Sequence, residues 1–146
     1  MDIAFTVHLP VDTGSVPFIR GLCRQALEHL DVERTVVDEI SLALTEACAN
    51  VVQHAGQRGL YEVTVAIDDR LCRISVVDSG EGFDPATLSE RDDRSPLDEG
   101  RGLLLMQALV DRLDFRHEPD GRHRVTLEKR LTPHPAHPPL RLVDPV

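Results

Sequence analysis

Glu46 and Asn50 are the residues of this sequence with the clearest potential for chemistry. They lie four residues apart, with His54 four further on, so on a helix all three share one face. A glutamate at the edge of a dry cleft is a candidate general base. An asparagine beside it offers a neutral oxygen, which suits Mg²⁺. The same spacing is common on solvated helices, so its meaning depends on the rest of the chain.

A second segment combines an aspartate with two closely spaced glycines. Asp78 ends an apolar run that reads as a buried strand, and Gly80 and Gly82 follow it. An aspartate at the mouth of such a turn can accept a hydrogen bond from an exocyclic amine such as that of adenine. The glycines let a ligand approach the main chain closely. A plain strand-exit turn gives the same pattern, so that alternative stays open.

A third segment, Gly100-Arg101-Gly102-Leu103, is predicted to precede a helix that runs from about Leu103 to Arg112. Backbone N–H groups at a helix N-terminus form an anion site, and the glycines would let phosphates come close. A flexible loop before a helix is the plain alternative. The chain has neither a G-x-x-x-x-G-K-[ST] nor a G-x-G-x-x-G motif. The three segments together therefore predict nucleotide recognition of another kind.

Two helices are expected before the second segment, each with apolar residues at steps of three and four. The first runs from Ser15, a candidate N-cap, to about Leu30, and the second from about Glu33 to His54. The first apolar stripe comprises Phe18, Leu22, Ala26 and Leu30. The second comprises Val36 or Val37, Ile40, Leu44, Ala47 and Val51. At 100° per residue, Glu46 and Asn50 lie at the margin of the second stripe, where a cleft would open.

Alternating apolar residues predict strands that pair as hairpins. The expected strands span residues 3–9, 61–67, 71–77, 113–116 and 124–131. Residues 80–100 are charged, lack a period and make an unusually long loop, which favours a functional segment. We expect a lid over residues 85–99 that a bound nucleotide would order. The sum is an α+β fold: a two-layer sandwich of helices on a mixed, mainly antiparallel sheet.

Composition limits the compartment and the partners. The formal net charge is −9, which argues against nucleic acid and against an anionic membrane surface. Cys23, Cys48 and Cys72 match no metal-binding spacing and read as free thiols packed as small hydrophobes. Reduced thiols, together with the lack of a signal-like start or a long apolar run, favour a cytoplasmic protein.

The length suits one domain, which we place at residues 1–131. Residues 132–146 form a proline-rich tail that cannot continue a sheet and is expected to be disordered. Its two histidines, with no other ligands nearby, are a poor match to a zinc site.

The three segments resemble the motifs of a known superfamily. Glu46-x-x-x-Asn50 resembles the N box of the GHKL ATPases, Asp78-x-Gly80-x-Gly82 the G1 box, and Gly100-x-Gly102 the G2 box. Within that superfamily, residues 44–55 and 100–106 are similar to the anti-sigma-factor serine/threonine kinases. The resemblance covers residues 3 to 130, approximately, and implies a Bergerat-type sandwich that binds ATP and Mg²⁺.

The resemblance also implies a role for each site residue. Asn50 would bind Mg²⁺, Asp78 the adenine amine, and Arg101 the γ-phosphate. The residues that would shape the pocket are Gly80, Gly82, Gly100, Gly102 and Leu103. Glu46 would be the base toward a serine or threonine hydroxyl. His54 matches a histidine often found at that end of the helix.

The expected partners are an anti-anti-sigma protein with a STAS domain and a sigma factor, and a homodimer is the usual assembly. The alternative function is a non-catalytic, ATP-dependent module that sequesters a regulatory partner. Glu46 favours the kinase, because a mere binder has no chemical need for it.

Overall fold

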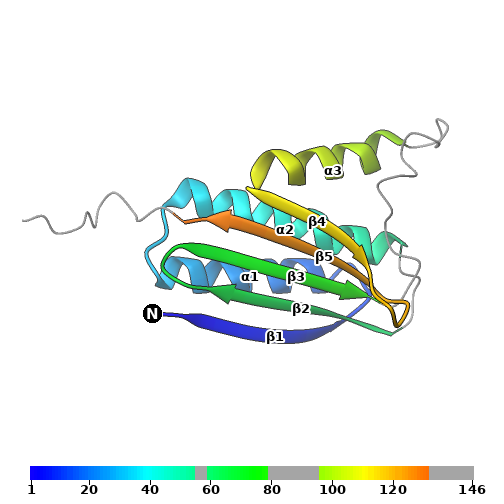
Figure 1. Ribbon diagram of the computed structural model, residues 1–146, viewed down its shortest axis with the longest axis horizontal. Coiled ribbons are helices and arrows are strands. Elements are labelled where there is room, and N and C mark those ends of the chain that lie inside the picture. The colour runs from blue at the N-terminus through cyan, green and yellow to red at the C-terminus, as the bar shows by residue number, and fades with distance from the viewer. Residues whose placement is uncertain (55–58, 79–95, 132–146) are drawn as a thin grey trace, which may run out of the picture.

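A five-stranded antiparallel sheet forms one layer of the protein (Figure 1). The computed structural model describes residues 1–54, 59–78 and 96–131, and over 96–100 it describes the backbone alone. The strand order is β1-β2-β3-β5-β4, and all four pairings are antiparallel. The strands are β1 (Ile3–Pro10), β2 (Leu60–Ile67), β3 (Leu71–Asp78), β4 (Arg112–His117) and β5 (His123–Arg130). Both predicted hairpins, β2–β3 and β4–β5, are confirmed.

Three helices cover one face of this sheet, which confirms the predicted two-layer α+β sandwich (Figure 1). They are α1 (Ser15–His29), α2 (Arg34–His54) and α3 (Pro96–Leu109). The central helix, α2, packs against both α1 and α3 and against β3 and β5. None of the described helices is long and apolar enough to cross a membrane.

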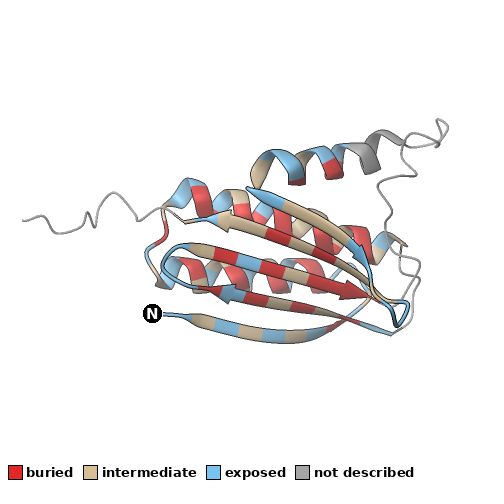
Figure 2. Cartoon of the chain, in the orientation of Figure 1, coloured by how far each residue is buried: buried red, intermediate tan, exposed pale blue. Residues whose placement is uncertain are grey.

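The predicted stripe of α2 is confirmed as the centre of an aliphatic core. Val36, Val37, Ile40, Leu44, Ala47 and Val51 are all buried. Figure 2 shows the buried positions alternating along β2 and along β3 as far as Val76, as a sheet covered on one face requires. At the end of β3, Val77 and Asp78 are both buried. The ion pair between Lys129 of β5 and Glu39 of α2, at 3.1 Å, fastens this helix to the sheet.

The buried face of α1 differs from the prediction. It consists of Ser15, Val16, Ile19, Cys23 and Leu27, whereas Phe18 is 58% exposed. The predicted row is adjacent to the buried one on the helix surface and is only partly covered. Both rows are apolar, so periodicity alone does not reveal which of them is buried. The contacts of α1 with α2 and with the sheet decide it.

Ser15 is not the N-cap of α1; Gly14 occupies that position. The Ser15 N–H donates to Asp12 Oδ1 (3.0 Å). The side chain of Asp12, rather than that of Ser15, therefore accepts a backbone hydrogen bond at the start of α1. The Ser15 hydroxyl donates to the Asp12 carbonyl (2.8 Å) and lies 2.6 Å from the Tyr61 hydroxyl. Ser15 therefore joins α1 to β2 from inside the core.

The three cysteines are free and buried, as expected of small hydrophobes. Burial raises the pKa of the Cys48 thiol to about 12. The pKa of Cys72 is also raised, first by a side-chain hydrogen bond with Cys23 and to a smaller extent by burial. The thiolate is the reactive form of cysteine, and a raised pKa keeps Cys48 and Cys72 protonated. These thiols therefore serve packing.

The predicted start of the last helix is wrong, because α3 begins at Pro96 rather than Leu103. Proline suits the first turn of a helix, because its backbone angle is already helical and its missing N–H has no partner there. Each interior glycine costs about 1 kcal/mol relative to alanine, which weakens a helix without ending it. The helix stops at Leu109 because Arg112 pairs in β4.

Several predictions concern residues outside those that the structure describes. Gly80 and Gly82 lie there, as do residues 85–95 of the expected lid and the tail at 132–146. Residues 96–99 of the expected lid belong to the first turn of α3.

Candidate functional site

Glu46 lies where α2 faces α3. It is half-buried, and a Cβ atom placed on Gly102 of α3 would lie 2.8 Å from its Oε1 atom. No real Cβ contact is that short, so the lack of a side chain at Gly102 leaves room for the carboxylate. The two predicted segments therefore meet at Glu46 and Gly102.

Gly102 consequently has a different position from the one predicted. The sequence indicated a glycine before a helix, poised to admit a phosphate. In the structure, Gly100, Arg101, Gly102 and Leu103 all lie inside α3, and the helix N-terminus is at Pro96. Arg101 is exposed, whereas Gly102 and Leu103 are buried. These residues therefore do not form the N-terminus of the helix, and their contact with a nucleotide stays a prediction.

Asn50 lies one helical turn beyond Glu46 and is buried, at 7% exposed. Its Nδ2 atom has no hydrogen-bond partner among the residues that the structure describes. A buried amide group left without a partner costs about 1–3 kcal/mol, so such groups in native proteins call for an explanation. Rotating the amide by half a turn presents its oxygen at the same position. Asn50 thus has binding capacity that the described fold does not use.

This capacity fits a magnesium–nucleotide complex. Among the described residues, no group of three or more His, Cys, Asp or Glu side chains could hold a metal ion. Mg²⁺ usually keeps several waters and binds through one or two protein oxygens plus substrate phosphates. A single amide oxygen, as at Asn50, suits a magnesium ion that also binds phosphates and water. It does not suit a metal ion that is held by protein side chains alone.

Asp78 is the last residue of β3 and is 5% exposed. Side chains alternate along a strand, so Asp78 points to the helix-covered face, like Ile74 and Val76. The carboxyl end of β3 and the C-terminal half of α2 lie at the same end of the molecule (Figure 1). Asp78 takes part in an interaction within the protein. Its burial places a carboxylate where it could accept a hydrogen bond from the amine of a ligand, away from bulk water.

The candidate site residues all lie within one region of sequence similarity. The family described as the histidine kinase-like ATPase domain matches residues 9–129. Serine-protein kinase RsbW from Bacillus mycoides (strain KBAB4) is 32% identical over 123 residues, which cover 77% of this chain and 76% of that protein. The RsbW of Bacillus cereus (strain G9842) is 31% identical with the same coverage. The chain belongs to the RsbW-like histidine kinase-like ATPases. The family's ATPase domain implies that the chain binds ATP.

Two solved structures show the same fold as this RsbW-like chain. The RsbU and RsbW domains of Rv1364c from Mycobacterium tuberculosis match with a TM-score of 0.68 and 23% identity, over 90% of this chain and 34% of that one. The SiaB–SiaC complex from Pseudomonas aeruginosa matches with a TM-score of 0.59 and 16% identity, over 86% and 89% of the two chains. At these identities, the two matches support the fold.

Sequence reasoning missed an apolar groove of about 490 Å³ on the α1 side of α2. Its walls include Val16 and Pro17 from α1 and Ala49 and Val52 from α2. Ala49 and Val52 are apolar residues outside the α2 stripe that predicted the core. Their position was the signal in the sequence that could have indicated the groove.

Gly102→Ala is expected to displace the Glu46 carboxylate while the fold persists. The new Cβ would meet the end of a flexible side chain, so Glu46 moves before the backbone does. The matched control is Gly21→Ala in α1, where an added Cβ meets nothing within 4 Å. Replacing glycine by alanine inside a helix stabilises by about 0.5–1 kcal/mol. The control should show that gain, and Gly102→Ala a smaller one.

Thermal unfolding and the carboxyl ¹³C chemical shift of Glu46 measure the two effects. A Glu46 signal that is the same in Gly102→Ala, Gly21→Ala and the parent would contradict the contact between α2 and α3.

Proposed function

We propose that this RsbW-like chain is a protein serine/threonine kinase that phosphorylates an anti-anti-sigma protein and thereby regulates transcription. The observation that carries the proposal is the Glu46 carboxylate, half-buried against Gly102 and one helical turn from Asn50. A sigma factor as second partner and a homodimer belong to the same proposal. The relatives named serine-protein kinase support the enzyme class.

The proposed roles follow from the chemistry of each side chain. When bound, Mg²⁺–ATP supplies the phosphoryl group and spreads its negative charge. Asn50 would hold the metal through its amide oxygen. Asp78 would accept a hydrogen bond from the adenine amine. Glu46 would orient the incoming hydroxyl and take its proton.

The proposal also covers the location of the protein and the remaining site residues. The use of ATP and the three buried, reduced thiols support a cytoplasmic protein. The roles of Gly80, Gly82, Gly100, Arg101 and Leu103 at the nucleotide stay predictions.

ATP affinity is expected to depend on magnesium. Removing the metal leaves the phosphate charge without its counter-ion and leaves the Asn50 oxygen without its ligand, so affinity should fall by about tenfold or more. Calorimetry with MgCl₂ and with EDTA measures the difference. Equal affinity in the two buffers would remove the metal from the proposal.

The partner is identified by purifying the chain from its native cell and analysing bound proteins by mass spectrometry. Transfer from radiolabelled ATP to the captured protein then tests the kinase. If the chain binds ATP and that partner tightly and transfers nothing, it is an ATP-dependent sequestering module instead.

A further inference from the structure

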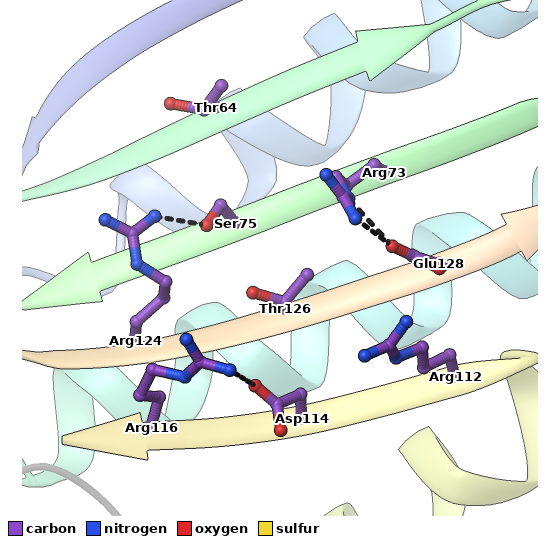
Figure 3. Close-up of a pocket in the computed structure, with 9 residues that line it drawn as sticks. All are labelled: Thr64, Arg73, Ser75, Arg112, Asp114, Arg116, Arg124, Thr126 and Glu128. Atoms are coloured by element: carbon purple, nitrogen blue, oxygen red, sulfur yellow. Dashed lines mark hydrogen bonds and ion pairs between the residues drawn. The ribbon is translucent and has the colours of Figure 1, made fainter. Parts of the chain in front are cut away.

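The sheet face that the helices leave uncovered has a polar depression of about 380 Å³ (Figure 3). Hydroxyl side chains form its floor. Thr64 pairs with Ser75, and Ser75 with Thr126, so the three hydroxyls make a row across β2, β3 and β5. Thr6 extends this row onto β1, with its Oγ1 atom 3.1 Å from that of Thr64. The row is a continuous strip of hydrogen-bonding groups on the outside of the fold.

Arginines stand on both sides of the hydroxyl row. Arg116 and Arg124 are register partners on one side. Arg73 and Arg112 are both register partners of Glu128, and so lie on the other side. All four side chains line the depression (Figure 3). The guanidinium groups therefore flank a floor that can itself donate and accept hydrogen bonds.

The depression is positive within an acidic chain. Its lining carries four arginines against two carboxylates, Glu128 and Asp114, a surplus of two positive charges. Glu118, outside the lining, pairs with Arg124 and leaves a surplus of one when it is counted. The whole chain has a formal net charge of −9. Positive charge is thus concentrated on this face against the overall balance.

Two of these arginines, Arg112 and Arg116, are the most available to an incoming anion. Arg124 already donates to Ser75 Oγ at 2.8 Å and to Glu118 Oε1 at 3.0 Å. Within the part of the chain that the structure describes, Arg112 has no ion pair or side-chain hydrogen bond. Arg116 meets Asp114 only at 3.6 Å, and Arg73 donates to Glu128 from an exposed position. The Arg116–Asp114 pair is exposed on both sides and contributes little, so this guanidinium can exchange one carboxylate for another. Its planar fork matches a carboxylate with two parallel hydrogen bonds.

We propose that this arginine-lined depression docks an acidic segment of a protein partner, independently of the nucleotide site on the other side of the sheet. A segment with spaced carboxylates places its charges against the arginines and its neutral atoms over Glu128 and Asp114. A polyphosphate chain or an anionic membrane carries dense charge, which those two carboxylates and the net charge of −9 oppose.

The test uses a fluorescein-labelled peptide of four Glu-Gly repeats and a matched peptide of four Gln-Gly repeats. In 50 mM NaCl the glutamate peptide should bind saturably, as measured by anisotropy, and shift the amide signals of Ser75 and Thr126. The glutamine peptide should not bind. Raising NaCl to 300 mM should weaken binding severalfold, because salt screens exposed charges.

Arg112→Glu should lower the affinity for the glutamate peptide by about tenfold, since it replaces a hydrogen bond to a charged group by repulsion. Arg112 is the best position to change, because no described partner loses its contact. The matched control is Arg34→Glu, which makes the same charge change at the exposed start of α2, in the helical layer. It should bind the peptide as the parent does, and both variants should keep the parental ATP affinity.

Three results would overturn the proposal. One is no binding of the glutamate peptide at 50 mM NaCl. Another is an equal loss in Arg112→Glu and Arg34→Glu, which would show a general charge effect. The third is displacement of the peptide by sodium phosphate but not by sodium chloride of equal ionic strength, which would show a small-anion site.

Discussion

Glu46→Gln is expected to slow phosphoryl transfer to the partner's hydroxyl by about 10²–10⁴-fold, the usual contribution of a general base. Glutamine keeps the shape of glutamate, so it fits the space beside Gly102, but it cannot accept the proton. ATP affinity should stay nearly parental, because Asn50 and Asp78 are unchanged. Single-turnover transfer from radiolabelled ATP measures the rate, and calorimetry measures the affinity.

Glu28→Gln is the matched control for this substitution, since Glu28 is an exposed glutamate of α1 in a loose pair with Arg24. It should transfer at the parental rate. Transfer by Glu46→Gln at that rate would leave the kinase in place but remove Glu46 as its base.

Asp78→Asn is expected to reduce the affinity for ADP by roughly tenfold or more, because a hydrogen bond to a charged group contributes about 1.5–3 kcal/mol. Asparagine preserves the size of this buried side chain and removes its charge. The preference for adenine over guanine nucleotides should shrink as well. Competition between ADP and GDP, measured on the same preparation, gives both values.

Asp69→Asn, at an exposed position in the turn between β2 and β3, controls for the loss of one charge. Thermal unfolding of both variants separates a folding defect from a binding defect. If folded Asp78→Asn discriminates between ADP and GDP as the parent does, another group reads the base.

Most of the fold could be predicted because its signals are local. The apolar stripe of α2 runs from Val36 to Val51 within a helix of 21 residues, which predicts both the helix and its buried face. The two hairpins followed from alternation around short turns. The α1 stripe was misplaced onto the neighbouring row that contains Phe18, because two apolar rows compete there and the packing of α2 chooses between them.

The site was less accessible to sequence reasoning. The burial of Asn50 agrees with its predicted place at the edge of the α2 stripe. The closeness of Glu46 and Gly102 depends on how α2 and α3 cross, which no local pattern encodes. Reading Gly100-x-Gly102 as a helix start gave too much weight to glycine and too little to Pro96. The arginine-lined depression depends on register across four strands, and alternation within one strand does not give that register.

The sheet order has a consequence for how the protein is made on the ribosome. Ile3 of β1 pairs with Ile67 of β2, so the first strand waits for both helices and β2 to emerge. During that interval α1 and α2 can associate, because helix pairs close in sequence form quickly. Their apolar undersides, which later rest on the sheet, stay exposed meanwhile. Exposed surface of this kind attracts aggregation and chaperones, so the nascent chain is most vulnerable just before β2 and β3 arrive.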